Sequence, residues 1–286
     1  MYNIAICING EPRYLERCTR SLQLARAFCN EHNIKLDIFY HLWDNITLRQ
    51  ENIENKPIVE EFNFNKIQDI LKITPTVGLV ESKDTLDTEI EYVYNYINSI
   101  ITEKQNKDNK NPINIYNMSR DLDNLKYQIK YSNCPPYSQL SSLCKTQMLR
   151  IEHEEKQDIK YDIVIRTRTD VEFSLPRIDK LTRALEKQNE EKPNPIYFPH
   201  MWSNGRGIGV EYCFVIGSSY NLTREIFENY KKDIPEILFQ IKRGKSVYVT
   251  TSHNFMPTLI HKYTNLLIRA GTLGCKQKIR QMERLF

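Results

Sequence analysis

The chain has 286 residues, which is enough for one large α/β domain or two small ones. Its formal net charge of only +4 excludes a strongly basic nucleic-acid binder by composition. The seven cysteines form no CxxC pair and have no metal-finger spacing with a histidine, which predicts reduced, buried thiols. The sequence has no run of about 18 apolar residues that would predict a membrane span, and its first residues do not resemble a signal peptide, so we expect a cytoplasmic protein.

The first part of the chain predicts a β-turn-α-β unit. Residues 3–8 (NIAICI) have the apolar run of a buried strand, residues 9–13 form a turn, and apolar residues recur at helical spacing over 14–32. Residues 35–43 predict a second strand, parallel to the first and joined to it by a right-handed crossover. The turn opens onto a helix N-terminus, where ligands and especially phosphates bind in open α/β sheets.

The middle of the chain is more polar. Residues 66–73 predict a short helix and residues 76–82 a short strand. An Asn- and Lys-rich, insertion-like region follows over about 83–133, with helical spacing at 89–101 and an expected exposed loop at 101–114.

A second helix-to-strand step is predicted after two prolines. One face of residues 138–157 is apolar at helical spacing, and residues 161–168 continue as a buried strand. The rest of the chain predicts short elements: strands at 194–200, 211–219 and 246–251, a Gly-rich loop at 201–210, and helices at 221–232, 234–244 and 268–286, the last of them basic.

Charged residues follow the apolar run of the stretch YDIVIRTRTDVEF (161–173). Alternate residues of a strand share a face, so Arg166, Arg168 and Asp170 should lie on one side, about 6–7 Å apart in succession. In a cleft, the guanidiniums would neutralise a nucleotide diphosphate, and the carboxylate would bind a divalent metal or a sugar hydroxyl. The alternative is a structural Arg–Asp ion pair at the end of a strand, and spacing alone does not decide between the two.

A family resemblance is carried by these same residues. The block YSQLSSLCKTQMLRIEHEEKQDIKYDIVIRTRTDVEF (137–173) resembles the central signature of a group of GT-A-like glycosyltransferases from polysaccharide and lipopolysaccharide synthesis. The segments IAICINGEPRYLERCTRSL (4–22) and DIFYHLWD (37–44) are similar to the opening of that family, and YCFVIGSS (212–219) with Pro235-Glu236 resembles its acceptor half. The resemblance implies a single GT-A-like, Rossmann-related α/β domain over residues 1–286, with a mostly parallel central sheet flanked by helices and a nucleotide-sugar donor.

Carried onto this chain, the resemblance implies that Gly10 and Arg13 border the nucleotide and that Arg168 and Asp170 replace the usual Asp-x-Asp motif. Since this motif has one carboxylate, Asp170 would be its single ligand to Mn²⁺ or Mg²⁺. Alternatively, the positive charge of Arg168 would neutralise part of the diphosphate in place of the metal. The residues also support a ligand site by themselves, because a Gly directly after a strand lets a ligand approach the backbone. A plain βα turn with an exposed Arg13 is the alternative.

Three further residues are candidates for the site. Trp43 and Asp44 end the second strand, where they would stack a base or sugar and bind a ribose hydroxyl; a half-buried Trp and a helix-capping Asp are the alternative. Glu211 follows the Gly-rich loop 201–210, which suits a lid facing the acceptor, so its carboxylate is a candidate base for activating the acceptor in an inverting reaction. The alternative is a turn with a solvated Glu.

Together these features predict a glycosyltransferase that moves a sugar from a nucleoside-diphosphate donor to a hydroxyl acceptor. Arg13, Arg166 and Arg168 would stabilise the departing diphosphate, and Asp170 would position the donor sugar or a metal. The acceptor is a glycan by resemblance. A hydroxylated DNA base is the other candidate, because the Asn/Lys/Ile-rich composition also suits a phage protein, which would act in the host cytoplasm.

Two other classes stay open. One is a non-catalytic module of the same fold that binds a nucleotide or glycan, and the other is a polyanion-binding interaction protein without a donor cleft. The basic tail over 268–286 would rest on anionic lipid, as a peripheral membrane contact, or on nucleic acid, and a solvated terminal helix is its alternative.

Overall fold

The computed structural model describes three continuous parts of the chain, residues 2–48, 58–88 and 136–173, together with isolated positions over 91–99, residue 175 and short strands further along. The continuous parts contain β1 (Asn3–Gly10), α1 (Leu15–Glu31), β2 (Lys35–Trp43), β3 (Asn45–Leu48), β4 (Ile58–Glu61), α2 (Phe64–Leu71), β5 (Val77–Glu81), a 3-10 turn (Lys83–Leu86), α6 (Pro136–Gln157), β6 (Ile163–Arg168) and β7 (Val171–Phe173). The later strands are β8 (Ile196–Phe198), β9 (Met201–Asn204), β10 (Gly207–Val210), β11 (Phe214–Gly217), β12 (Phe239–Lys242), β13 (Ser246–Val249), β14 (Ile268–Ala270) and β15 (Gln277–Ile279).

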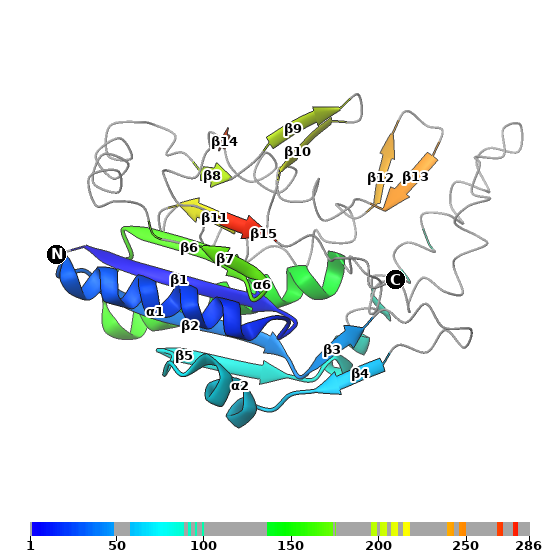
Figure 1. Ribbon diagram of the computed structural model, residues 1–286. Coiled ribbons are helices and arrows are strands. Elements are labelled where there is room, and N and C mark those ends of the chain that lie inside the picture. Colours follow the sequence, from blue (N-terminus) through cyan, green and yellow to red (C-terminus); the bar gives the residue numbers. More distant parts are fainter. Residues whose placement is uncertain are drawn as a thin grey trace, which may run out of the picture.

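One seven-stranded sheet organises these elements, in the order β14-β8-β11-β6-β1-β2-β5 (Figure 1). The four strands β5, β2, β1 and β6 run parallel, and β11 is antiparallel to β6. In this register the Cα of Cys7 lies opposite those of Phe39 and Arg166. The predicted α/β class, with a parallel pairing of the first two strands and a largely parallel central sheet, is therefore confirmed.

One face of the parallel strands is apolar and is covered by α1 and α2 (Figure 1). Buried residues recur along α1 at helical spacing and pack on alternate residues of β1, which share one side of the strand: Leu15, Cys18, Leu22, Ala25 and Cys29 meet Ile4, Ile6 and Ile8. Removing this apolar surface from water is the main stabilising contribution on this side of the sheet.

The other face of the sheet is covered by α6, and its buried residues are largely polar (Figure 1). Arg150 is 0% exposed; its Nη1 donates to Glu154 Oε1 at 2.8 Å and its Nε donates to Gln147 Oε1 at 3.0 Å. The backbone N–H of Tyr161 donates to the same Glu154 oxygen at 3.3 Å. Buried charges are tolerated when they are paired and hydrogen-bonded in this way, so the contact between α6 and the sheet depends on polar interactions.

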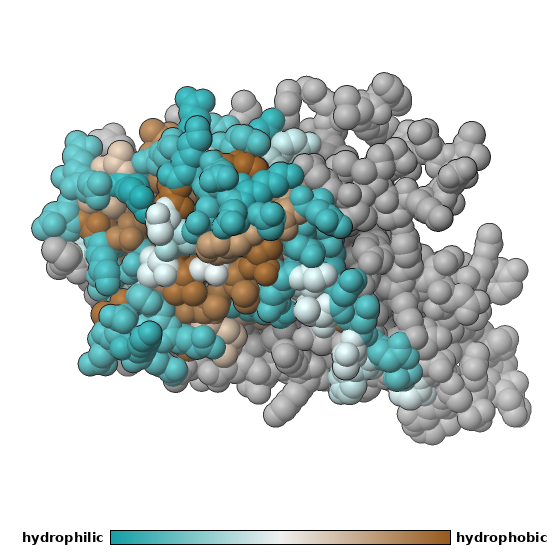
Figure 2. Space-filling view, turned by 90° about the horizontal axis from the view of Figure 1, so that it is seen from below, coloured by the Kyte–Doolittle hydropathy of each residue, from teal (hydrophilic) through white to brown (hydrophobic). Residues whose placement is uncertain are grey.

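The surface on the side of β5 is mostly hydrophilic. Figure 2 looks from the side of β5, which forms one edge of the sheet, and shows hydrophilic side chains around an apolar area in the middle of the described surface. All five residues of β5 are partly exposed, as befits an edge strand. No helix in the described part of the chain is long and apolar enough to cross a membrane.

Most elements predicted in the first half of the chain are confirmed within a few residues, as α1, β1, β2, α2, β5, α6 and β6. Lys83, at the start of the polar region predicted over about 83–133, is fully buried in the 3-10 turn after β5. The loop predicted at 101–114 and the helix at 221–232 lie outside the described residues.

Three predictions in the second half are wrong. The loop at 201–210 contains the antiparallel pair β9–β10, and the predicted helix at 234–244 contains β12, which pairs with β13. The prediction of a basic helix over 268–286 is wrong at two places, where the chain forms strands instead. β14 pairs with β8, and β15 pairs with β7. In each case pairing with a partner strand overrides a weak local preference.

The four described cysteines are Cys7, Cys18, Cys29 and Cys144, and all four are buried thiols outside any disulfide, as expected. Loss of hydration on burial raises the pKa of the thiols of Cys7 and Cys29 to about 11 and that of Cys18 to about 12.

Candidate functional site

The strand order reverses at the boundary between β1 and β6. From β1 the chain goes on to β2 and β5 on one side, whereas β6 lies on the other side. Such a switch point leaves a crevice outside the carboxyl ends of the strands, where ligands bind in open α/β sheets. A pocket of about 30 Å³ lies there, between the ends of β1, β2 and β6 and the first turn of α6. Its lining residues are Asn9, Gly10, Glu11, Arg13, Trp43, Ser138, Gln139, Arg168, Thr169 and Asp170. The volume equals that of about two water molecules, so these walls enclose one group of a larger ligand.

Gly10 gives the pocket an open floor. Its φ is +112°, in the region that favours glycine, and a Cβ placed on it would meet no atom within 4 Å. The Gly10 N–H donates to Ser142 Oγ at 2.7 Å, which ties the end of β1 to α6. Backbone conformation therefore requires glycine here, and the space beside it is open to a ligand, as predicted for this turn.

A charged cluster lies at one side of the pocket, centred on Glu11. Arg13 Nε donates to Glu11 Oε2 at 2.6 Å, and Lys83 Nζ forms an ion pair with Glu11 Oε1. The side chain of Lys83 is only 1% exposed, and burial lowers the pKa of its amino group, while the charge of Glu11 opposes that shift. Thr169 Oγ1 donates to the backbone oxygen of Glu11 at 2.6 Å. Arg13 thus lines the pocket, and in place of the alternative, a plain turn with an exposed Arg, the structure has an ion-pair cluster.

Arg168 and Asp170 lie at the opposite side and form a two-pronged ion pair. Arg168 Nε donates to Asp170 Oδ1 at 2.8 Å, and Arg168 Nη2 pairs with Asp170 Oδ2. Both residues also line the pocket. The structure therefore combines the two predicted alternatives, because the pair is a structural ion pair that faces a candidate ligand site.

The charged side chains that line the pocket balance one another. Arg13 and Arg168 contribute two positive charges, and Glu11 and Asp170 contribute two negative charges; Lys83 pairs with Glu11 but is not part of the lining. Arginine presents five N–H donors, so it can bind a carboxylate and a phosphate together. The two arginines are therefore the groups of this lining that can bind an anionic group.

Asp170 is already engaged by an arginine. Both of its carboxylate oxygens accept from Arg168, and no group of three or more His, Cys, Asp or Glu side chains in the described parts of the chain could hold a metal ion by itself. Mg²⁺ is usually held by one or two carboxylates together with substrate phosphates and waters. A metal at Asp170 would therefore share the carboxylate with Arg168 and take its other ligands from the diphosphate and water.

The structure places Trp43 in the pocket wall and Asp44 outside it. Trp43 lines the pocket but is 0% exposed; Lys145 Nζ lies 5.2 Å from the centroid of its ring and the His41 ring packs against it edge-on. A ring covered in this way has no face on which a base or sugar can stack. Asp44 is outside the pocket lining and accepts from Asn45 Nδ2 at 2.7 Å, and it caps no helix because β3 follows it.

Arg166 does not lie in the pocket, where the motif would put it beside the diphosphate. It shares a strand face with Arg168, but it is 1% exposed and does not line the pocket. Two residues of strand move a side chain about 6–7 Å, so Arg166 lies further from the open end of the sheet than Arg168 does. The structure thus brings together Gly10, Arg13, Arg168 and Asp170, whereas Glu211 lies outside the described residues.

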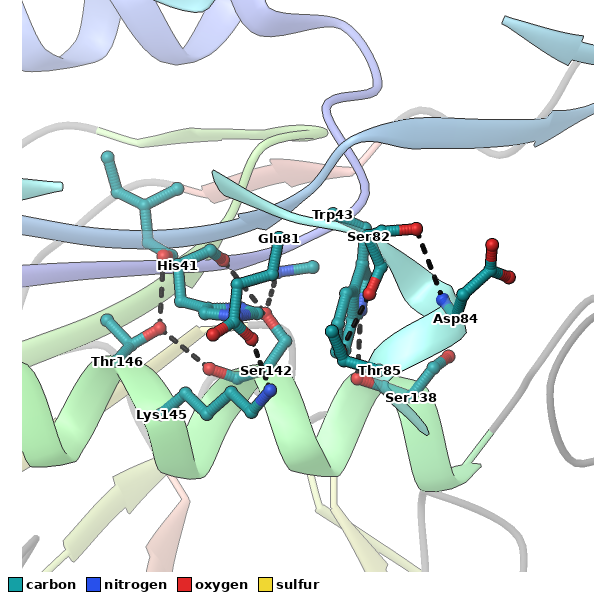
Figure 3. Close-up of polar contacts among 12 residues, drawn as sticks. His41, Trp43, Glu81, Ser82, Asp84, Thr85, Ser138, Ser142, Lys145 and Thr146 are labelled. Atoms are coloured by element: carbon teal, nitrogen blue, oxygen red, sulfur yellow. Dashed lines mark hydrogen bonds and ion pairs between the residues drawn. The ribbon is translucent and has the colours of Figure 1, made fainter. Parts of the chain in front are cut away.

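A buried polar network connects the pocket floor to the surface (Figure 3). His41 Nδ1 lies 2.9 Å from Ser142 Oγ, and His41 Nε2 lies 3.0 Å from Glu81 Oε2, which also pairs with Lys145. A carboxylate can only accept, so Nε2–H donates to Glu81. The Ser142 hydroxyl donates its one proton to the backbone oxygen of His41 at 2.8 Å, and its oxygen faces Nδ1. The order carboxylate, imidazole, hydroxyl is that of a hydrolase triad, but Ser142 is 0% exposed, so its oxygen cannot reach a substrate. The network therefore holds α6 against the sheet.

This network should make stability depend on acid pH. Burial lowers the pKa of His41, and the hydrogen bond from His41 lowers the pKa of Glu81 to about 2. Both groups therefore take up protons more readily in the unfolded chain, so stability falls as pH drops, through His41 from about 6.5 and through Glu81 from about 4.5. We expect the thermal midpoint to fall less steeply between pH 6.5 and 5 in His41→Gln than in the wild type. His32→Gln, at a partly exposed position, should keep the wild-type slope; equal slopes for His41→Gln and wild type would contradict this assignment.

The sequence analysis missed several residues of the site. Asn9 and Glu11 flank Gly10 directly, so their place after the first strand was a usable signal. Ser138 and Ser142 offered none, because nothing in a helix sequence shows which strand end it covers. Lys83 was assigned to the polar region that follows β5, since a buried lysine looks like a solvated one in the sequence.

Comparison of the chain with known protein families gives no match, and comparison with curated protein sequences gives none. Function is therefore inferred from the geometry of the pocket and from the residues of the R-x-R-x-D motif that line it.

Proposed function

We propose that the protein is a glycosyltransferase of GT-A type and that the switch-point pocket takes part of a nucleoside-diphosphate sugar, whose sugar passes to a hydroxyl acceptor. The observation that supports this most directly is the meeting of Gly10, Arg13, Arg168 and Asp170 in one pocket at the carboxyl ends of β1 and β6. These residues come from segments more than 150 positions apart, and all four belong to the motifs that resemble the family.

Each side chain has a definite role in this proposal. Arg13 and Arg168 neutralise charge that develops on the departing diphosphate, which is electrostatic stabilisation of the transition state. Asp170 accepts a hydrogen bond from a hydroxyl of the donor sugar and keeps Arg168 oriented. Gly10 leaves room for the ligand beside the backbone. Glu211 stays the proposed base that removes the acceptor proton, and a glycan is the proposed acceptor, with a DNA base as the alternative.

The pairing of Arg168 with Asp170 supports a second candidate, a module that binds a nucleotide or glycan without catalysis. The ion pair leaves the site without the second carboxylate of an Asp-x-Asp motif. The two candidates differ in one observable: both bind the ligand, but only the glycosyltransferase releases the nucleoside diphosphate by transfer or slow hydrolysis.

The test is a thermal-shift panel of UDP-, GDP-, ADP- and CMP-sugars and the matching nucleotides without sugar, with and without Mn²⁺. A ligand at 100 times its dissociation constant adds about 2.7 kcal/mol to the free energy of unfolding. We expect one nucleotide class to raise the midpoint. Asp170→Asn should weaken binding of that nucleotide sugar by about tenfold to a hundredfold, because a charge-assisted hydrogen bond to the sugar is lost. It should weaken the nucleotide without sugar by less, since there only the orientation of Arg168 is affected.

Two controls complete this design. Asp158→Asn makes the same carboxylate-to-amide change at an exposed position, and should bind all ligands as the wild type does. Arg168→Met should weaken binding of the nucleotide sugar and of the nucleotide together. If no ligand shifts the wild-type midpoint, the glycosyltransferase proposal and its binding-module alternative both fail, and Arg168–Asp170 is an ion pair alone.

A further inference from the structure

Asn9 is a pocket residue whose side-chain oxygen, Oδ1, has no hydrogen-bond partner in the described part of the chain. It precedes Gly10 at the end of β1, it lines the pocket, and it is 2% exposed. Its Oδ1 accepts no hydrogen bond from any described residue. In the sheet it lies between His41 of β2 and Arg168 of β6. Buried side-chain amides are nearly always hydrogen-bonded, so this oxygen requires an explanation.

The position separates Asn9 from other buried atoms of this kind. Tyr40 Oη, Ser141 Oγ and Gln147 Nε2 also have no partner in the described parts of the chain, but none of these three residues lines the pocket. Among the described residues, Asn9 alone combines a buried, unpartnered side-chain atom with a place in the pocket wall. A ligand that enters the pocket is therefore the group that can satisfy it.

The chemistry of the atom restricts the ligand. A carboxamide oxygen accepts hydrogen bonds, so its partner must be a donor. The oxygens of a diphosphate at neutral pH accept as well and cannot fill this role, whereas hydroxyl groups and ring N–H groups can. The anionic group of the ligand is better placed at Arg13 and Arg168, which also line the pocket.

We propose that the Asn9 carboxamide is a recognition group of this pocket, whose oxygen accepts a hydrogen bond from a hydroxyl or a ring N–H of the bound ligand. It thereby contacts the organic part of the ligand, whereas the diphosphate binds at Arg13 and Arg168. This inference rests on the proposed function in that the ligand is a nucleotide or nucleotide sugar. The donor group is a sugar or ribose hydroxyl, or an N–H of the base.

The test compares wild type with Asn9→Leu, which has a similar shape but no polar atoms. Affinities are measured by calorimetry for inorganic pyrophosphate, for UDP, GDP, ADP and CMP, and for their sugar conjugates. We expect Asn9→Leu to lose at least tenfold in affinity for the nucleotide ligand that binds the wild type and to keep its pyrophosphate affinity within twofold. It should also unfold at a higher temperature without ligand, because an unpaired buried amide has been removed. Asn30→Leu, on the exposed surface of α1, should change no affinity.

Further ligands identify the donor group. The 2′,3′-dideoxy form of the nucleotide lacks the ribose hydroxyls, an N-methylated base lacks its ring N–H, and the nucleotide without sugar lacks the sugar hydroxyls. The analogue that lacks the donor recognised by Asn9 should bind wild type and Asn9→Leu equally. Asn9→Asp retains an acceptor oxygen, so it should bind the complete ligand better than Asn9→Leu does.

The outcomes separate this inference from the proposed function. If a nucleotide sugar binds the wild type and Asn9→Leu equally well, the role of Asn9 is overturned and the proposed function stands. If Asn9→Leu unfolds at a lower temperature and weakens every ligand alike, pyrophosphate included, Asn9 is structural and the inference is again overturned. If nothing in the panel binds the wild type, the proposed function fails, and the unfolding temperature of Asn9→Leu still decides whether the amide is unpaired in the free protein.

Discussion

Replacing Arg150 with methionine should lower the free energy of unfolding by about 3–5 kcal/mol, because the change leaves a buried carboxylate without its main cation. Arg150 and Glu154 are 0% and 2% exposed, and they face the sheet from adjacent turns of α6. The remaining donors are weaker: the Tyr161 N–H is 3.3 Å from the carboxylate, and Lys160 Nζ is 3.6 Å away on a mostly exposed side chain. Urea denaturation followed by circular dichroism gives the change directly.

The double variant Arg150→Met/Glu154→Gln provides the internal comparison. It removes both charges, so it should recover a large part of the lost stability. Lys156→Met, at an exposed position in the last turn of the same helix, should change stability by no more than about 0.5 kcal/mol. A loss below about 1 kcal/mol for Arg150→Met would show that the polar layer under α6 contributes little to stability.

Replacing Lys83 with methionine should cost about 3 kcal/mol of unfolding free energy, near the lower end for a broken buried ion pair. Glu11 is only 9% exposed and would keep Arg13 as a cationic partner, which limits the loss. The same variant should also weaken binding of an anionic ligand, because Lys83 and Arg13 together position Glu11 at the pocket wall. Denaturation and the nucleotide panel measure the two effects separately.

Lys156→Met again provides the matched change at an exposed site. A variant in which both Lys83 and Glu11 are neutralised, Lys83→Met/Glu11→Gln, should be more stable than Lys83→Met alone. Should Lys83→Met prove as stable as the wild type, the pair with Glu11 would not be a buried ion pair in solution.

The first half of the fold could be predicted because each element has its own periodicity. β2 begins and ends where the apolar run predicts, at Lys35 and Trp43, and the apolar spacing over 14–32 gives α1 within a residue at each end. The later strands could not be found in this way. β12 has four residues and pairs with β13, and this pairing, which lies outside the segment itself, decides its conformation.

The site was predictable as far as strand ends are concerned. Parallel strands bring their carboxyl ends to one edge, so Gly10 at the end of β1 and Arg168 at the end of β6 had to come close. Which of the two arginines reaches the pocket was not predictable. Arg166 and Arg168 share a residue type and a strand face, but Arg166 is buried and Arg168 lines the pocket. The contribution of α6 was not predictable either, because the contact of Ser142 with Gly10 joins residues 132 positions apart.

The buried thiols divide between the two faces of the sheet. Cys18 and Cys29 belong to α1, whereas Cys144 belongs to α6. Only an ionised, accessible thiol reacts with an alkylating reagent, and burial withholds both conditions. A reagent therefore modifies Cys18 when α1 lifts from the sheet and Cys144 when α6 does. The alkylation rates of Cys18 and Cys144 therefore report separately on the two layers. The first measures how often α1 separates from the apolar face of the sheet, and the second how often α6 separates from the polar face.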